Sequence, residues 1–381
     1  MISDVLVCVV VTDEEDAERA LESAARIGDD AGRVDVLVLD ETTRESEQET
    51  VRRTVARLGL PSYRSPRRLG GTRAINLALR AALDGDYSGA LLMTGADVLA
   101  ASAVERLAGA AAATGAAAVM AWSTSSGEYA LECTDAVALR KDQEYVDAVG
   151  TALASNFGDV VFDVPHVSDA CVLLPLEAVR EVGLLDPVLE DRGAALTEWS
   201  LRARARGRRI CLAPAAFVAS SPPPADVPEY PVPAEVRRAR LGAAVVDLRY
   251  PQFREQMVAF RSSGLVAAAR AGAGRCLVRE GARTSGYAIE VGWLAPPPPP
   301  GAPRRVRCSV SPEPADRLTC EYRGFTFARG LAGDEDVVDV LAELFEGPPA
   351  EVHLYDRGTV ATAVAERTGL ATDHFTYPTR V

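Results

Sequence analysis

Two carboxylates stand just after apolar stretches of the sequence, where a side chain can reach a bound ligand. Asp40 follows the mostly apolar residues 34–39, and Asp97 comes after a short turn that follows residues 90–93. Carboxylates accept hydrogen bonds from ligand N–H groups and are good ligands for hard cations. Each also has a plainer interpretation, as a turn residue or as a helix N-cap.

A glycine pair precedes an arginine at the start of a helix-like segment. Gly70 and Gly71 are followed by Arg73 and then by Asn76. Glycine lets the backbone approach a ligand closely, and a helix N-terminus with an arginine attracts phosphate. The plainer interpretations are a simple turn, a solvated arginine and an asparagine that contacts the neighbouring fold.

Four side chains farther along carry groups that can exchange a proton, namely His166, Asp169, Asp191 and Glu198. A general base must lie within hydrogen-bonding reach of the proton that it removes. Glu198 also stands four residues before Arg202, and such a helical pair is worth only a few tenths of a kcal/mol. His166 is equally interpretable as a hydrogen-bonded structural residue.

Apolar strand-like runs alternate with helix-like segments over the first 220 residues, which predicts an α/β fold with a mostly parallel sheet and helices on both faces. In such sheets ligands bind at the carboxyl ends of the strands. The predicted strands are 5–11, 34–39, 90–94, 117–122, 168–174 and 209–218, and the predicted helices are 17–27, 48–58, 74–83, 104–113, 177–182 and 197–206.

The chain is predicted to contain a second domain after a proline-rich linker. We expect residues 1–220 to form the first domain, 221–233 the linker, and 234–381 a helical segment followed by a small α+β domain. The pattern indicates helix over 234–275 and hairpins over 304–327. A homo-oligomer, where one forms, is expected to use this C-terminal part.

Composition excludes several classes of function. The net charge is −13, which argues against a nucleic-acid-binding surface. Seven widely spaced cysteines predict reduced thiols in the cytoplasm. We find no signal peptide and no apolar run long enough to span a bilayer. Lys141 is the single lysine, a bias typical of a high-GC bacterium.

The order of these motifs and predicted elements resembles that in the family-2 glycosyltransferases of the GT-A fold, and in the rhamnosyltransferase-like members in particular. Five motifs carry the resemblance across residues 5–220. They are Val9-Val10-Val11-Thr12-Asp13, Val38-Leu39-Asp40-Glu41, Gly70-Gly71-Thr72-Arg73-Ala74-Ile75-Asn76, Met93-Thr94-Gly95-Ala96-Asp97, and the segment from Ser168-Asp169-Ala170-Cys171 to Thr197-Glu198-Trp199-Ser200-Leu201-Arg202.

The resemblance implies an inverting transfer of a sugar from a UDP- or dTDP-sugar to a hydroxyl group of a small-molecule or glycan acceptor. Asp40 and Thr12 would bind the base. Gly71, Arg73 and Asn76 would face the diphosphate, and Asp97 would hold Mg²⁺ or Mn²⁺. Asp169 and His166 would line the acceptor site, and Glu198 or Asp191 would act as the base.

Three positions depart from the family's pattern. Gly95 replaces the first metal carboxylate, Ala195 and Leu196 replace the usual acidic pair, and Ser220 replaces a metal-binding histidine. An alternative is therefore a catalytically inactive GT-A-like protein that binds a nucleotide or serves as a scaffold. A nucleotidyltransferase is disfavoured, because residues 12–16 are acidic where that class needs a basic glycine-rich loop.

Overall fold

The computed structural model describes residues 4–12, 17–29, 33–124, 127–167, 171–220, 234–292, 304–310, 317–331, 336–355, 359–370 and 373–374. The chain divides into two compact units. The first comprises residues 1–131 and 136–266, and the second comprises residues 132–135 and 267–381. Within the described residues, no helix combines the length and the apolarity needed to cross a membrane.

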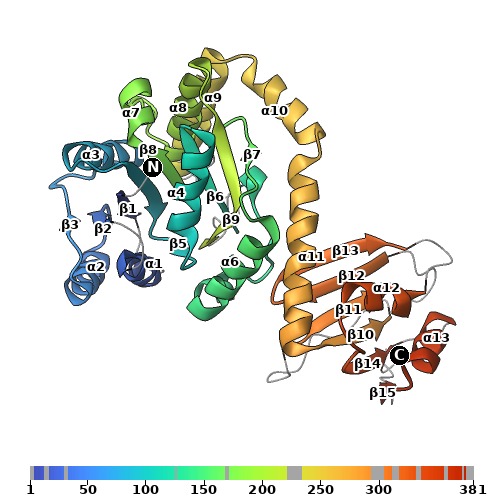
Figure 1. Cartoon of the computed structure of the whole chain (residues 1–381). Helices are drawn as coiled ribbons and strands as arrows, with labels where there is room; N and C mark the ends of the chain where they lie inside the picture. The colour runs from blue at the N-terminus through green and yellow to red at the C-terminus, as the bar shows by residue number, and fades with distance from the viewer. Residues whose placement is uncertain are drawn as a thin grey trace. The chain divides into compact units, whose positions relative to one another are not determined.

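The first unit is built on one mixed sheet whose strand order is β3-β2-β1-β4-β8-β6-β9-β5, with β7 paired to β9 (Figure 1). Its strands are β1 (Val5–Val11), β2 (Val34–Asp40), β3 (Ser62–Tyr63), β4 (Gly89–Thr94), β5 (Asp97–Leu99), β6 (Ala118–Ser123), β7 (Phe162–Asp163), β8 (Val172–Pro175) and β9 (Ile210–Ser220). The pairs β1–β2, β1–β4, β2–β3 and β6–β9 are parallel, whereas β5, β7 and β8 pair antiparallel with their neighbours.

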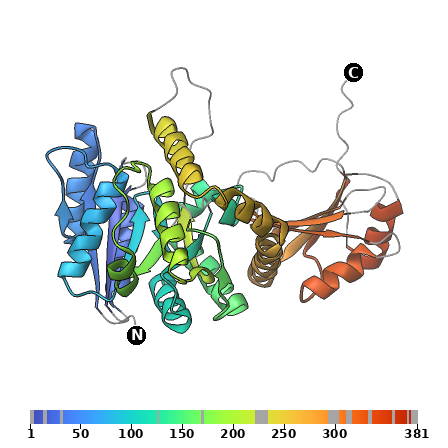
Figure 2. The ribbon, with the colours of Figure 1, turned by 90° about the horizontal axis from the view of Figure 1, so that it is seen from above.

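Helices cover both faces of this sheet, as the view from above shows (Figure 2). They are α1 (Ala17–Ala25), α2 (Glu45–Leu58), α3 (Gly71–Asp84), α4 (Ala103–Thr114), α5 (Ala136–Arg140), α6 (Gln143–Phe157), α7 (Leu176–Val182), α8 (Arg192–Ala205), α9 (Ala234–Arg249) and α10 (Phe253–Ser262), with single 3₁₀ turns η1 (Arg26–Asp29) and η2 (Gly127–Tyr129). The expected α/β class is confirmed.

The alternating direction of the side chains along β1 explains why helices pack on both faces of the sheet. Val5, Val7, Val9 and Val11 join one buried cluster with residues of α1, α2 and α4. Successive side chains of a strand point to opposite faces, so the intervening residues of β1 face α3, which contacts this strand. Every residue of β1 is buried, as an apolar strand in the middle of a covered sheet requires.

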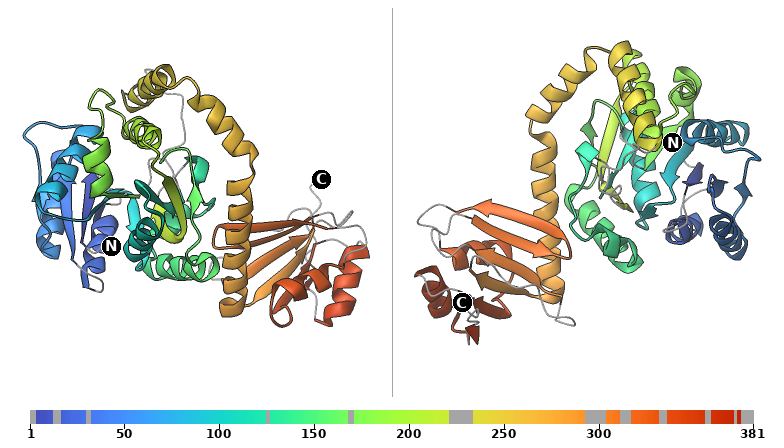
Figure 3. Two further views of the ribbon diagram at one scale, coloured as in Figure 1. Left: turned by 45° about the horizontal axis from the view of Figure 1, so that its top comes forward. Right: turned by 180° about the vertical axis from the view of Figure 1, so that it is seen from behind.

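The second unit is an α+β arrangement with the strand order β13-β12-β11-β10-β14-β15 (Figure 3). Its elements are α11 (Leu265–Ser285), β10 (Tyr287–Val291), β11 (Val306–Val310), β12 (Arg317–Tyr322), β13 (Phe325–Gly330), α12 (Val337–Leu344), β14 (Glu351–Leu354), α13 (Thr359–Thr368) and β15 (Asp373–His374). Alternate residues of β10, β11 and β14 form its core with α12 and α13.

The predicted helix over 234–275 is three helices instead of one. Pro251 lies in the turn between α9 and α10, and Gly264, with φ +71°, lies between α10 and α11. Proline lacks the N–H that a helix interior needs, and glycine tolerates a positive φ. Both breaks were therefore readable from the sequence.

Helices α9 and α10 belong to the first unit, so this unit extends past the predicted boundary at residue 220. A Cβ placed on Gly242 of α9 would lie 2.6 Å from the Cβ of Ala194 in α8, so the two helices pack closely. The ring of Phe253 in α10 lies 5.3 Å from that of His166. The linker over 221–233 lies outside the described residues.

Candidate functional site

Asp40 ends β2 and is buried, with 8% of its surface exposed. The backbone N–H and the hydroxyl of Thr42 donate to its Oδ1 at 3.0 and 2.6 Å, and Nη1 of Arg64 pairs with the same oxygen at 2.9 Å. Among the described residues, all three partners of Asp40 thus approach Oδ1. This leaves Oδ2 as an acceptor for a ligand.

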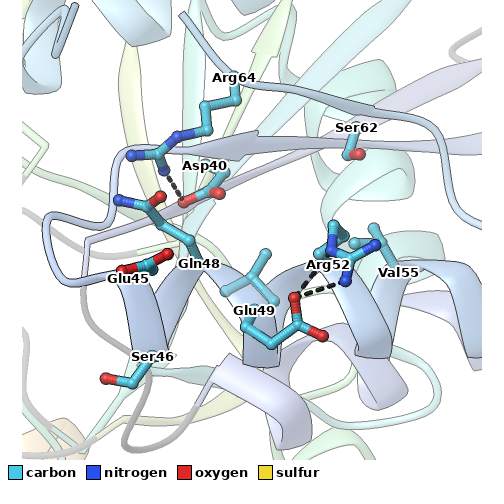
Figure 4. Close-up of a pocket in the computed structure, with 10 residues that line it drawn as sticks. Asp40, Glu45, Ser46, Gln48, Glu49, Arg52, Val55, Ser62 and Arg64 are labelled. Carbon is cyan, nitrogen blue, oxygen red and sulfur yellow. Dashed lines mark hydrogen bonds and ion pairs between the residues drawn. The ribbon is translucent and has the colours of Figure 1, made fainter. Parts of the chain in front are cut away.

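A hollow of about 600 Å³ opens beside Asp40, between the end of β2 and α2 (Figure 4). It is lined by Asp40, Glu45, Ser46, Gln48, Glu49, Val51, Arg52, Val55, Ser62 and Arg64. A smaller hollow of about 250 Å³ shares Asp40 and Arg64 and adds Arg68 and Thr42. Arg64 and Arg68 bring positive charge next to the buried Asp40, and the carboxylates Glu41, Glu45 and Glu49 line the same two hollows. Neither arginine was predicted as a site residue, although both stand only a few residues before the glycine pair.

Glu41 holds the loop that follows β3. It is 4% exposed, and its Oε2 accepts hydrogen bonds from the backbone N–H groups of Leu69 and Gly70 at 2.9 and 3.0 Å. Gly70 has φ +81°, a conformation that favours glycine. The carboxylate therefore fixes the chain immediately before α3, a contact that the sequence did not predict.

The start of α3 packs against the start of α8 and against the segment after α7. A Cβ on Gly71 would lie 3.5 Å from the Cβ of Arg192. Asn76 pairs with the backbone of Leu185, donating to its carbonyl at 2.8 Å and accepting from its N–H at 3.0 Å. The amide is thus used in tertiary packing, the plainer of its two interpretations, whereas the side chain of Arg73 is exposed.

The strand ends meet in register at one edge of the sheet. Asp40 lies opposite Val11 on β1, and the N–H of Gly95 donates to the carbonyl of Val10 at 3.0 Å. Asp40 and Gly95 therefore stand about two strand spacings, roughly 10 Å, apart. Thr12 is exposed at the end of β1. Within the described residues, Thr12, Arg73 and Asp97 line neither hollow.

Asp97 is turned inward from this edge, with 3% of its surface exposed. Its Oδ2 accepts hydrogen bonds from the backbone N–H and the hydroxyl of Thr94, at 2.7 and 3.0 Å. Its Oδ1 accepts a short hydrogen bond of 2.5 Å from the hydroxyl of Ser220. Both carboxylate oxygens are engaged inside the protein.

The two predicted bases have structural contacts. Asp191 is the N-cap of α8 and accepts the N–H of Ala194 at 2.8 Å, which is why α8 begins at Arg192 and not at the predicted residue 197. Glu198 is 3% exposed and accepts hydrogen bonds from Nε of Arg202 at 2.9 and 3.0 Å.

The Glu198 carboxylate belongs to a hydrogen-bond network with Arg202 and Tyr250, which we call the clamp. Tyr250 donates its hydroxyl to Glu198 at 3.1 Å. Arg202 donates to the carbonyls of Val182 and Leu184 at 2.7 and 2.8 Å. The clamp ties α8 to the end of α7 and to the segment after α9. Of the two interpretations of Glu198, these contacts match the ion pair with Arg202.

His166 lies in an aromatic cluster, 5.6 Å from the ring of Tyr129 and 5.3 Å from that of Phe253. Its Nδ1 lies 3.2 Å from the hydroxyl of Thr197. Burial lowers the pKa of the imidazole to about 4, so the ring is neutral near pH 7. Asp169, the other predicted acceptor residue, lies outside the described residues.

Sequence comparisons give no relative, since no family model and no curated protein matches the chain. The structure is similar to GalNAc-T7 crystallised with UDP, GalNAc and Mn²⁺, at 13% identity and a TM-score of 0.43, over 57% of this chain and 44% of that one. It is also similar to S. aureus TarS, at 13% identity and a TM-score of 0.44, over 74% and 48%.

A third similar structure is S. aureus TarS 1–349 in complex with UDP-GlcNAc, at 12% identity and a TM-score of 0.45, over 73% of this chain and 81% of that one. The chain spans about half the length of GalNAc-T7 and of TarS, from the shares of 44% and 48%. Because these TM-scores lie below 0.5, a proposal about activity has to rest on the chain's own residues.

Proposed function

We propose that this chain is a glycosyltransferase of the GT-A, family-2 kind, which transfers a sugar from a UDP- or dTDP-sugar to a hydroxyl acceptor with inversion. The observation that carries the proposal is Asp40. It is a buried carboxylate at the end of a parallel strand, beside a hollow of about 600 Å³, with Oδ2 left for a ligand.

Asp40 selects for a base with an imide N–H. Uracil and thymine present a donor at N3, and the ionised carboxylate accepts it in a charge-assisted hydrogen bond. Cytosine presents an acceptor at the same ring position, so it meets the carboxylate with two facing lone pairs. Arg64 keeps Oδ1 occupied and fixes the carboxylate plane. The site thereby distinguishes uridine and thymidine nucleotides from cytidine nucleotides.

Calorimetric titration with UDP and CDP tests this step. The full chain is expected to bind UDP at least about tenfold more tightly than CDP, since a mismatched buried polar group costs about 1–3 kcal/mol. Asp40→Asn is expected to abolish that preference. Asp35→Asn is the matched control, because Asp35 lies on the same strand and pairs with Arg33. Equal affinities for UDP and CDP in the unaltered chain would refute the proposed base site.

A second candidate is a nucleotide-binding protein without turnover. It is favoured by the contacts of Glu198 and Asp191, since each predicted base is engaged in holding α8. Glu190, which neighbours Asp191, is exposed and is the carboxylate that we propose as base if transfer occurs. Release of UDP from a panel of UDP- and dTDP-sugars decides between the two. Binding of UDP without any release supports the second candidate.

A further inference from the structure

The charges that line the larger hollow beside Asp40 do not cancel. The lining contains two ion pairs, one between Arg64 and Asp40 at 2.9 Å and one between Arg52 and Glu49 at 2.5 Å. Glu45 lines the same hollow from the first turn of α2 and is exposed, and within the described residues its carboxylate has no hydrogen bond or ion pair. Glu45 therefore leaves the hollow with one unbalanced negative charge and with acceptor oxygens that a ligand can use.

Helix periodicity places Glu45 at the same end of the hollow as Asp40. Residues three or four apart on a helix share one face, and the spacing of Glu45, Gln48 and Arg52 puts them on the face of α2 that lines the hollow. Figure 4 shows Glu45 and Gln48 toward the end where Asp40 lies, and Arg52 toward the other end. The side chain of Asp40 is 9% exposed, and none of its described partners approaches Oδ2. Two carboxylates with unused oxygens therefore line this end of the hollow.

A divalent cation does not fit these carboxylates. In the part of the chain that the structure describes, no group of three or more His, Cys, Asp or Glu side chains is placed to hold a metal ion. Asp97, the expected metal ligand, uses both of its oxygens for hydrogen bonds to Thr94 and Ser220. The described residues therefore do not fit the cation that the family resemblance implies, and Glu45 needs a hydrogen-bond donor of another kind.

This end of the hollow suits an uncharged donor better than a phosphate group. A phosphate beside the carboxylate of Glu45 would meet like charge, which disfavours binding. A hydroxyl group instead donates a hydrogen bond to a carboxylate, and such charge-assisted bonds are stronger than neutral ones. In a nucleotide the ribose is bonded directly to the base. When Asp40 holds the base edge, the 2′- and 3′-hydroxyls of the sugar therefore have to lie close to this end of the hollow.

We propose that Glu45 accepts hydrogen bonds from the 2′- and 3′-hydroxyls of the nucleotide's ribose, so that the site selects UDP-sugars over dTDP-sugars. The inference rests on the proposed function, because it concerns the same ligand. A deoxyribose lacks the 2′-hydroxyl and gives the carboxylate one donor instead of two. A site that hydrogen-bonds a hydroxyl discriminates against an analogue without it, because its polar group is left without a partner. Glu45 thereby decides between two bases whose imide N–H Asp40 accepts equally.

Calorimetric titration of the full chain with UDP, dUDP and dTDP tests the inference. UDP and dUDP differ only in the 2′-hydroxyl, whereas dUDP and dTDP differ only in the methyl group of the base. UDP is expected to bind at least about fivefold more tightly than dUDP. This factor is smaller than a buried charge-assisted bond would give, because Glu45 is exposed. UDP is expected to bind more tightly than dTDP as well.

Variants then test the assigned residue, which is exposed, so that its replacement is not expected to prevent folding. Glu45→Ala is expected to bring the affinities for UDP and dUDP to within about twofold of each other. Glu45→Gln keeps an acceptor oxygen without the charge, and its ratio is expected to lie between those of alanine and the unaltered chain. Glu105→Gln is the matched control, because Glu105 is an exposed carboxylate in the first turn of α4 and lines neither hollow. It removes the same charge from a helix N-terminus and is expected to leave the ratio unchanged.

The outcomes separate this inference from the proposed function. Equal affinities for UDP and dUDP in the unaltered chain, with UDP still preferred over CDP, overturn the ribose contact and leave the proposed base site standing. Binding of dTDP as tight as that of UDP overturns the selection between the two kinds of donor. A UDP preference that survives unchanged in both Glu45 variants overturns the assignment of Glu45. If none of these nucleotides binds, the proposed function and this inference both fall.

Discussion

The clamp around Glu198 gives a prediction that separates structure from catalysis. Glu198→Gln keeps the shape of the side chain but removes the charge that Arg202 and Tyr250 meet. A hydrogen bond to a charged group contributes about 1.5–3 kcal/mol, and breaking a fully buried ion pair costs about 3–5 kcal/mol. The side chain of Arg202 is 23% exposed, which places the expected loss near the lower figure, at about 2 kcal/mol.

Differential scanning calorimetry of the full chain measures this loss. For a unit of this size, about 2 kcal/mol corresponds to a fall of roughly 4–8 °C in the Tm of the first unit. Tyr250→Phe removes one neutral donor and is expected to cost about 1 kcal/mol. In the double variant the two losses should not add, because both side chains share the Glu198 carboxylate.

A different result would assign Glu198 to catalysis instead of to stability. A Glu198→Gln variant that melts like the unaltered chain but has lost sugar transfer would show that Glu198 is the catalytic base, and that the clamp contributes little. Glu177→Gln is a suitable control, because Glu177 is 81% exposed and forms an ion pair with Arg208 at 3.1 Å. It is expected to change the Tm by less than about 2 °C.

Two further predictions concern the loop before α3 and the aromatic cluster. Glu41→Ala leaves the N–H groups of Leu69 and Gly70 without their acceptor, so we expect a loss of about 2 kcal/mol in unfolding free energy and faster hydrogen exchange at these two amides, whereas unchanged exchange would contradict the assigned role. Burial lowers the pKa of His166 to about 4, from about 6.5 when unfolded, so the unfolded chain binds more protons between these values. Stability contributed by the neutral ring is therefore present above pH 6.5 and is lost as the pH falls toward 4, by at most about 1.4 kcal/mol per pH unit. His166→Gln should flatten this part of the urea-unfolding profile, and an equal slope in both proteins would refute the cause.

The chain's local patterns predicted the framework well. The apolar runs of β1 and β2, the helix period of α3 and the carboxylates that end strands all follow from residue type and spacing. Boundaries were less accurate where a side chain caps a helix. Asp191 starts α8 five residues before the predicted position, and Glu47 accepts the N–H of Arg44 at 3.0 Å to start α2 at Glu45.

The candidate site likewise contains residues that the local sequence predicts and contacts that only the fold creates. Asp40 could be selected from the sequence, because the end of an apolar strand fixes its place on the sheet edge. Its partner Arg64 could not, since that contact joins residues 24 positions apart through the packing of β3 on β2. Asp97, Asn76 and Glu198 looked like ligand residues by position, but each faces an acceptor or donor within the protein.

The sequence alone determined the alternation of strands and helices, the two-part organisation and the edge at which a ligand is expected, because these depend on local propensity and periodicity. Only the tertiary structure decided which polar side chains are left to meet a ligand. That depends on where distant polar groups lie in the fold: the backbone of Leu185 meets Asn76, the hydroxyl of Ser220 meets Asp97, and the hydroxyl of Tyr250 meets Glu198, whereas the described partners of Asp40 all approach its Oδ1. A buried polar atom takes whichever partner the fold brings to it, and no spacing along the chain encodes that choice.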